Sequence, residues 1–197
     1  MMEKIISSEG ARFKVQELPL KGAYEIEMQG IVDSRGSFSR LFCEEFFEEI
    51  GFYKSISQVN TSFTKKKGSV RGLHFQYPPS AEIKIVTCLK GEIFDVLVDI
   101  RKGSPTFLQW VGVYLSEENK KSVLIPEGFA HGFQTMTSDV DMLYFVSASY
   151  DPEKEGGLNI LDPNLGIKWP YEVTEISDKD KQWSLSSGCF LGVNWQE

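Results

Sequence analysis

The sequence predicts a mainly β protein that folds as a sandwich or a barrel, with a few short helices. Short segments rich in Val, Ile, Phe and Tyr follow one another closely between residues 84 and 149, and these residue types favour strands. Turn residues such as Lys90-Gly91 and Gly103-Ser104-Pro105 separate the segments. Many short strands at close spacing are typical of two packed sheets or of a closed barrel.

The apolar runs give the expected elements in order along the chain. One helix is expected within residues 41–50, because Phe42, Phe46 and Ile50 fall on one stripe and Gly51 supplies a C-terminal stop. The expected strands are residues 71–76, 84–90, 92–100, 109–115, 122–126, 131–136 and 141–149.

Length and composition indicate one globular domain. A chain of 197 residues with 41% hydrophobic side chains is long enough to bury one core. We expect a single domain over residues 1–197, with the barrel core at about residues 30–170. The segment 171–197 contains Trp183, Phe190 and Trp195 and is too aromatic for a disordered tail, so we expect it to pack back on the barrel.

Charge and the N-terminal sequence exclude several classes of partner. A net charge of −7 and a pI of about 5.0 give no basic surface for a nucleic-acid backbone. The start, MMEKIISSEG, lacks the apolar run of a signal peptide, and no segment approaches the ~18 apolar residues of a membrane span. The three cysteines are widely spaced without a CxxC pair, which favours neither a disulfide framework nor a thiolate metal site. We therefore expect a cytoplasmic protein.

Strand alternation predicts which polar residues share a face. If residues 84–100 form a hairpin that turns at Lys90-Gly91, Val86 lies opposite Asp95 and Lys84 lies opposite Leu97. Lys84 and Asp95 then share one face as diagonal neighbours.

A second hairpin is expected over residues 131–146, turning at about Ser138-Asp139. It places Phe133 opposite Tyr144 and His131 opposite Val146, so that His131 and Tyr144 share a face. A slip of one residue would turn a whole strand over.

In the segment RGLHFQ, alternation places His74 and Gln76 on one face and Arg71 on the other. Arg71 joins His74 only through a bulge, which Gly72 permits. If the predicted faces line one barrel interior, the cavity holds His74, His131, Tyr144, Lys84 and Asp95. Taken singly, a strand Lys or Asp is more often solvated and a strand Tyr more often a core residue. The two histidines, the only ones in the chain, favour a functional site.

Ordered motifs run from about residue 31 to residue 181. They include DSRGSF, SQVNTS, SVRGLHFQYPP, KIVTCLKGEIFDVLVDIRKGSPTF, LIPEGFAHGFQT, LYFVSASYDPEKEGG and ISDKD. In order and spacing they resemble the dTDP-4-dehydrorhamnose 3,5-epimerase family of sugar-nucleotide epimerases. This resemblance implies a cupin-like jelly roll and an isomerase that acts on a nucleotide-linked 4-keto-6-deoxy sugar without a cofactor. It also implies a homodimer, sometimes formed by exchange of N-terminal strands.

The resemblance implies a role for each matching residue. His74 is similar to the family's general base, Asp180 to the carboxylate that pairs with it, and Tyr144 to the acid that returns a proton. Lys84 is similar to the lysine beside the sugar ketone. The residues that match sugar-binding or nucleotide-binding positions are Asp95, His131, Arg35, Gln58, Asn60, Arg71, Glu155, Lys179 and Tyr150.

The chemistry explains these residue types. Hydrogens on C3 and C5 of a 4-keto sugar are both next to the carbonyl, so removal of either gives an enolate. A neutral imidazole, with an unperturbed pKa of about 6.5, is a suitable base near neutral pH. A carboxylate orients it, a lysine stabilises the enolate oxygen, and a phenol on the opposite side delivers the new proton.

Several alternatives remain open at the level of sequence. A cupin barrel often holds a metal, and the chain has enough ligands for a site of two histidines and one carboxylate. Against this, His74-Phe75-Gln76 stands where a metal-binding cupin would have HxH, and Lys84 would repel a cation. Arg40 and Thr87 depart from the family pattern, which makes a CDP-linked sugar the second choice. A 3,4-ketoisomerase of the same fold is the nearest enzyme alternative, and a non-catalytic sugar-nucleotide binding cupin is the alternative from another class.

Overall fold

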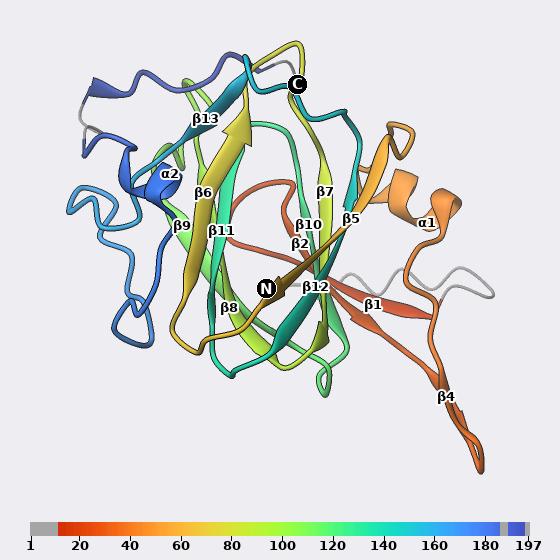
Figure 1. The fold of residues 1–197 in the computed structure, drawn as a ribbon. Helices are drawn as coiled ribbons and strands as arrows, with labels where there is room; N and C mark the ends of the chain where they lie inside the picture. Colours follow the sequence, from red (N-terminus) through yellow and green to blue (C-terminus); the bar gives the residue numbers. More distant parts are fainter. Residues whose placement is uncertain (1–11, 186–188, 196–197) are drawn as a thin grey trace.

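The computed structural model describes residues 12–185 and 189–195, and within them it consists mainly of antiparallel strands in two sheets that face each other (Figure 1). The strands are β1 (Phe13–Glu17), β2 (Tyr24–Met28), β3 (Ile31–Asp33), β4 (Gly36–Phe38), β5 (Gln58–Thr64), β6 (Val70–Gln76), β7 (Lys84–Lys90), β8 (Glu92–Asp99), β9 (Trp110–Ser116), β10 (Lys121–Ile125), β11 (Phe129–Thr135), β12 (Val140–Val146) and β13 (Glu155–Gly157). The helices are α1 (Glu44–Glu49) and α2 (Asp178–Lys181). The predicted mainly β fold with a few short helices is confirmed.

The two large sheets divide the strands between them. One sheet has six strands in the order β1-β2-β10-β7-β12-β5, and the other has five in the order β13-β6-β11-β8-β9. Strands β3 and β4 form a separate two-stranded hairpin.

Both predicted hairpins are wrong, because the turns after β7 and after β11 carry the chain from one sheet to the other. Val86 pairs with Tyr144 rather than with Asp95, and Asp95 pairs with Phe133. Gly91 at the first turn has a φ of +78°. In a two-sheet fold, a strand that changes sheet at such a corner buries its apolar face against the opposite layer, so the neighbours in sequence face each other instead of pairing.

The faces predicted from alternation are nevertheless correct. Inward side chains of both sheets meet in a core that includes Val86, Leu97, Phe133 and Met142. Outward side chains of the five-stranded sheet, such as Val96, pack under the later segments of the chain in a second cluster. Polar residues that face inward are therefore collected in one interior, whichever strands pair.

Helix α1 covers the outer face of the six-stranded sheet (Figure 1). Phe46 and Ile50 are buried there and Phe42 packs against the same cluster, as the predicted stripe requires. The helix begins after Cys43 and is shorter than predicted, and Gly51 follows its end with a φ of +111°.

The β3–β4 hairpin projects away from the two sheets (Figure 1). Its apolar side chains Ile31, Val32 and Phe38 are exposed. Near its tip, Arg35 donates hydrogen bonds from Nε and Nη2 to the carboxylate of Asp33.

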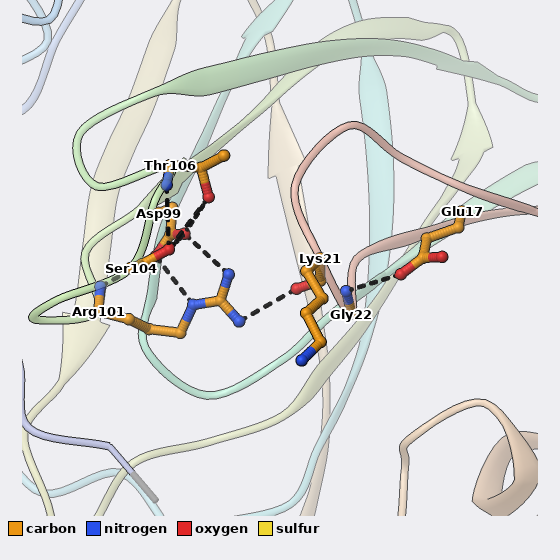
Figure 2. Close-up of polar contacts among 7 residues, drawn as sticks. All are labelled: Glu17, Lys21, Gly22, Asp99, Arg101, Ser104 and Thr106. Atoms are coloured by element: carbon orange, nitrogen blue, oxygen red, sulfur yellow. Dashed lines mark hydrogen bonds and ion pairs between the residues drawn. The ribbon is translucent and has the colours of Figure 1, made fainter. Parts of the chain in front are cut away.

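A buried ion pair ties several segments together at the end of β8 (Figure 2). Arg101 donates to Asp99 from Nε at 2.9 Å and from Nη2 at 2.8 Å, and the Ser104 and Thr106 hydroxyls donate to the same carboxylate. Arg101 Nη1 donates to the backbone carbonyl of Lys21 in the β1–β2 turn, 3.0 Å away. The pair therefore links the β8 end, the following loop and the N-terminal hairpin.

Among the described residues, no helix has the length and apolar character needed to cross a bilayer.

Candidate active site

A cavity of about 700 Å³ lies between the two sheets and contains most of the predicted site residues. It is lined from both sheets and from the segment around α2. The predicted residues that line it are His74, Asp180, Tyr144, Lys84, His131, Arg71, Gln58, Asn60, Glu155, Lys179 and Tyr150. Two predicted residues, Asp95 and Arg35, do not line it.

His74 and Asp180 form a close pair at the wall of the cavity. His74 Nε2 lies 2.5 Å from Asp180 Oδ1, and the Asp180 side chain is 3% exposed. Ser177 caps α2, because its hydroxyl accepts from the backbone N–H of Asp180. If Nε2 donates to the carboxylate, the neutral ring keeps Nδ1 unprotonated and able to accept a proton.

The electrostatic balance keeps Asp180 ionised. Burial alone would raise the pKa of Asp180, but hydrogen bonds from His74 and from the backbone N–H of Gly72 hold that pKa below its usual value. A carboxylate in this state stabilises an imidazolium beside it.

Regular alternation would place Arg71 on the face opposite His74, but a bulge in β6, which Gly72 permits, brings the two residues to the same cavity. His131 pairs with His74 and Phe133 pairs with Arg71, so two residues of β6 face one of β11 at this point. Gly72, with a φ of +120°, lies so close to β11 that an added Cβ would stand 2.5 Å from the Gly132 Cα. Arg71 then donates from Nε to Thr64 Oγ1 at 2.9 Å.

His131 has its own carboxylate partner. His131 Nε2 lies 2.8 Å from Asp95 Oδ1, and the Asp95 side chain is fully buried behind the histidine. Asp95 Oδ2 has no hydrogen-bond partner among the described residues. Asp95 thus reaches the cavity through His131 rather than directly, which corrects its predicted place on the cavity wall.

Tyr144 points its phenol into the interior, where its oxygen lies 2.9 Å from Ser62 Oγ. Burial is the main reason that the pKa of Tyr144 is raised to about 12; the negative charge of Asp95 acts in the same direction, while the Ser62 hydrogen bond opposes the shift. The phenol therefore carries its proton throughout the neutral range.

Lys84 is held by a residue that the sequence interpretation missed. Lys84 Nζ lies 2.6 Å from Glu82 Oε1, and both residues line the cavity. Strand alternation could have identified Glu82, because residues two apart in an extended segment share a face. The same rule would have placed Ser62 beside Asn60.

A charged cluster stands at another part of the cavity wall. Tyr150 donates its hydroxyl to Glu155 Oε2 at 2.7 Å, and Lys179 Nζ lies 2.5 Å from the same oxygen. Burial alone would raise the pKa of Glu155, but the hydrogen bonds from Lys179 and Tyr150 lower it, and the hydrogen bond to Glu155 raises the pKa of Lys179. The backbone N–H of Tyr150 donates to Gln58 Oε1. An aromatic ring beside cationic and amide groups is suited to a nucleotide.

Arg35 is the predicted residue that the fold does not bring to this cavity. It lies near the tip of the projecting β3–β4 hairpin, where its side chain is 88% exposed and pairs with Asp33. Alternation could not reveal this, because the direction of a projecting hairpin depends on packing that the local sequence does not encode.

Within residues 12–185 and 189–195, no three His, Cys, Asp or Glu side chains converge in a way that would hold a metal ion. The two histidines each face one carboxylate instead. The site therefore combines an oriented imidazole, a protonated phenol and an ammonium group around one cavity, which is a set for moving protons next to a carbonyl.

Comparisons with known proteins agree on one family. The sequence profile of dTDP-4-dehydrorhamnose 3,5-epimerase matches residues 17–187. A dTDP-4-dehydrorhamnose 3,5-epimerase of Salmonella typhimurium is 47% identical over 161 residues, covering 81% of this chain and 87% of the relative.

Two solved structures share the fold. A dTDP-6-deoxy-D-glucose-3,5-epimerase from Legionella pneumophila, solved with dTDP-4-keto-L-rhamnose, has a TM-score of 0.87 and 40% identity, covering 94% of this chain and 100% of that one. A 3'-monoepimerase from Streptomyces bikiniensis, solved with dTDP-quinovose, has a TM-score of 0.83 and 32% identity, covering 91% of this chain and 92% of that one.

Proposed function

The chain belongs to the dTDP-4-dehydrorhamnose 3,5-epimerase family, and from this premise we propose that it inverts C3 and C5 of a dTDP-linked 4-keto-6-deoxyhexose. The chain is thus an isomerase of deoxysugar biosynthesis, the class to which its curated relatives belong. The observation that carries the proposal is the His74–Asp180 pair in the wall of the same cavity that Tyr144 and Lys84 line.

In the proposed reaction, His74 removes the hydrogen from the carbon next to the C4 ketone. The electron pair of the broken C–H bond forms the C=C bond of the enolate, and the negative charge moves to the ketone oxygen. Asp180 orients His74 and stabilises the imidazolium. Lys84 stabilises the enolate oxygen, an interaction worth about 3 kcal/mol in a site that excludes water.

Inversion is completed when a proton reaches the same carbon from the other face. Tyr144 is the proposed donor, and its pKa of about 12 supports this role because the phenol carries its proton at neutral pH. The phenolate then regains a proton from solvent and His74 loses its own, so that protons balance over the cycle. The second carbon next to the ketone reacts by the same steps.

The charged and aromatic residues of the cavity are the proposed binding site for the nucleoside diphosphate. Arg71 and Lys179 supply positive charge, Tyr150 supplies a ring for the base, and His131 with Asp95 behind it holds the sugar. Gln58, Asn60 and Glu155 complete the polar lining. A volume of about 700 Å³ lies within the range of roughly 300 to 1,000 Å³ that is usual for small-molecule sites.

We further propose that the protein is a cytoplasmic homodimer in which Arg35 enters the cavity of the second copy. Two features support the dimer. Arg35 lies outside the cavity of its own chain, and the hairpin that carries it exposes Val32 and Phe38, at 77% and 70%, as a surface for a partner. The free thiols of Cys43, Cys88 and Cys189 suit a reducing compartment.

The experiment that tests the function is incubation with dTDP-4-keto-6-deoxyglucose in heavy water. We expect deuterium at both C3 and C5 and a product of inverted configuration, detected by NMR. Deuterium at C3 alone would identify a 3-epimerase, a shifted keto group would identify a ketoisomerase, and no exchange would identify a binding protein. The CDP-linked sugar in a parallel reaction tests the nucleotide, and His74→Ala, which removes the base from a partly exposed position, is the inactive control.

A further inference from the structure

Glu82 occupies a position beside Lys84 that no part of the proposed reaction uses. Glu82 Oε1 lies 2.6 Å from Lys84 Nζ, and Glu82 Oε2 accepts a hydrogen bond from Gln76 Nε2 at 3.0 Å. The side chains of Glu82 and Lys84 are 12% and 16% exposed, so water screens their interaction only weakly. All three residues line the cavity.

The orientation of Gln76 is fixed by the backbone around it. Its Oε1 accepts from the N–H of Asp151 at 2.6 Å, and a backbone N–H can only donate. The amide nitrogen therefore faces the other way, toward the backbone carbonyl of Ser80 at 2.9 Å and toward Glu82. Gln76 is 5% exposed and follows His74 by two residues in β6.

The two groups that flank Glu82 are therefore both donors. The Lys84 ammonium has no acceptor, and the Gln76 amide presents its N–H. A side chain between them must accept on both of its ends, which a carboxylate does and an amide of the same shape does not. With glutamine at position 82, one N–H group would point at another donor, at the cost of an unsatisfied buried group.

These contacts connect the two sheets at the cavity. Gln76 is the last residue of β6 in the five-stranded sheet, whereas Lys84 is the first residue of β7 in the six-stranded sheet. We propose that Glu82 is a positioning residue that anchors the Lys84 ammonium to Gln76 and so fixes it at the place where the enolate oxygen forms. The inference rests on the proposed function, because it concerns the stabilisation of that oxygen.

A positioning role predicts a specific kinetic change. Lysine has four rotatable side-chain bonds, and without its anchor the ammonium samples several positions. The Glu82→Gln variant is expected to lose about tenfold to a hundredfold in kcat, the effect of misplacing a group by an ångström or less. Its KM and its affinity for dTDP stay unchanged, because the nucleotide contacts lie elsewhere in the cavity.

A matched control is available toward the β1 edge of the six-stranded sheet. Glu25 Oε1 lies 2.6 Å from Lys121 Nζ, a pair of the same length between β2 and β10 with 19% and 32% exposure. Glu25→Gln removes a comparable ion pair that does not line the cavity. Its kcat is expected to equal that of the wild type.

The decisive experiment is a double-mutant cycle on kcat with Glu82→Gln and Lys84→Met. If Glu82 acts through Lys84, the double variant has the kcat of Lys84→Met alone. Losses that multiply, or a Glu82→Gln variant as active as Glu25→Gln, overturn the inference. Should Glu82→Gln fail to fold in thermal melts, Glu82→Asp, which retains the charge, replaces it in the cycle with the same two outcomes. Deuterium incorporation by the wild-type enzyme tests the proposed function separately. If the wild type is active and the kcat losses of the two substitutions multiply, only the role of Glu82 is disproved and the proposed function stands.

Discussion

Asp180 Oδ1 lies 2.5 Å from His74 Nε2, although 106 residues separate the two in the chain. The carboxylate comes from the short helix α2 and the imidazole from strand β6. Their contact fixes the orientation of the imidazole, as the proposed role of His74 as a base requires.

The Asp180→Asn variant should lose most of its activity while it keeps its substrate affinity. An amide of the same size does not stabilise the imidazolium and favours the wrong tautomer, an effect on the order of 10⁴-fold in kcat when the base is a histidine. Steady-state kinetics and dTDP titration measure the two quantities. A variant with kcat near that of the wild type would show that His74 does not depend on this carboxylate.

Tyr144→Phe should separate proton removal from inversion. His74 and Lys84 remain, so deuterium from heavy water should still enter at the carbon next to the ketone, with its configuration retained. The rate of inversion should fall by about 10² to 10⁴-fold, the usual contribution of a positioned acid. NMR of deuterium content and of product configuration in one sample gives both rates.

The raised pKa of Tyr144 determines how kcat should depend on pH. Because burial raises the pKa of Tyr144 to about 12, the proton donor is present at every pH below that value. Ionisation of Tyr144 should therefore cause no fall in kcat between pH 7 and about pH 10, the ordinary pKa of tyrosine. An alkaline loss of activity that is present in the wild type and absent from the residual activity of Tyr144→Phe would contradict this assignment.

Mixed dimers should show whether Arg35 acts in the second copy. Arg35→Ala and His74→Ala are each expected to be inactive or nearly so. If Arg35 of one chain serves the cavity of the other, a mixed dimer of the two variants contains one intact site, and activity returns on mixing after subunit exchange. If Arg35 serves its own chain, or no site, mixing restores nothing. Light scattering of the wild type establishes the oligomeric state independently.

The sequence predicted the faces of the strands better than their partners. Alternation placed Lys84, Asp95, His131 and Tyr144 on the interior faces of their strands, because a period of two is a local property of the chain. Pairing is not local. The turn at Lys90-Gly91 has the same residue types whether it closes a hairpin or crosses between sheets, so the choice depends on how the two layers pack.

Within the site, the Gly72 bulge could be predicted because glycine marks close approach of two backbones. The link from His74 to Asp180 had no local signal, since no periodicity joins β6 to a segment 106 residues later. It came from the family resemblance. Glu82 was missed although alternation would have placed it on the face of Lys84, because a carboxylate two residues from a lysine is usually a solvated pair.

Two aspartate–arginine pairs with the same spacing in the chain differ in burial and should therefore differ in their contribution to stability. Asp99–Arg101 and Asp33–Arg35 both place the arginine two residues after the aspartate, with Nε and Nη2 donating to the carboxylate. The first pair is 0% and 5% exposed, whereas the second is open to solvent. Asp99→Asn leaves a buried guanidinium without its counter-charge and should lower the free energy of unfolding by about 3 to 5 kcal/mol at pH 7.

The difference should depend on pH in one direction. Burial opposes ionisation of Asp99, but hydrogen bonds from Arg101, Ser104 and Thr106 outweigh it and hold the pKa of Asp99 below its usual value. A carboxyl group with a lowered folded-state pKa stabilises the fold above its unfolded pKa of about 3.9, and this contribution disappears as the pH falls through the folded value. The gap in denaturant-unfolding free energy between wild type and Asp99→Asn should therefore be constant from pH 5 to pH 7 and shrink below about pH 4. Asp33→Asn, measured in parallel on the dissociated monomer, should change stability far less at any pH, because in the single chain solvent already screens that pair. Equal effects of the two substitutions would mean that burial of the Asp99–Arg101 pair contributes nothing to holding the N-terminal turn against β8.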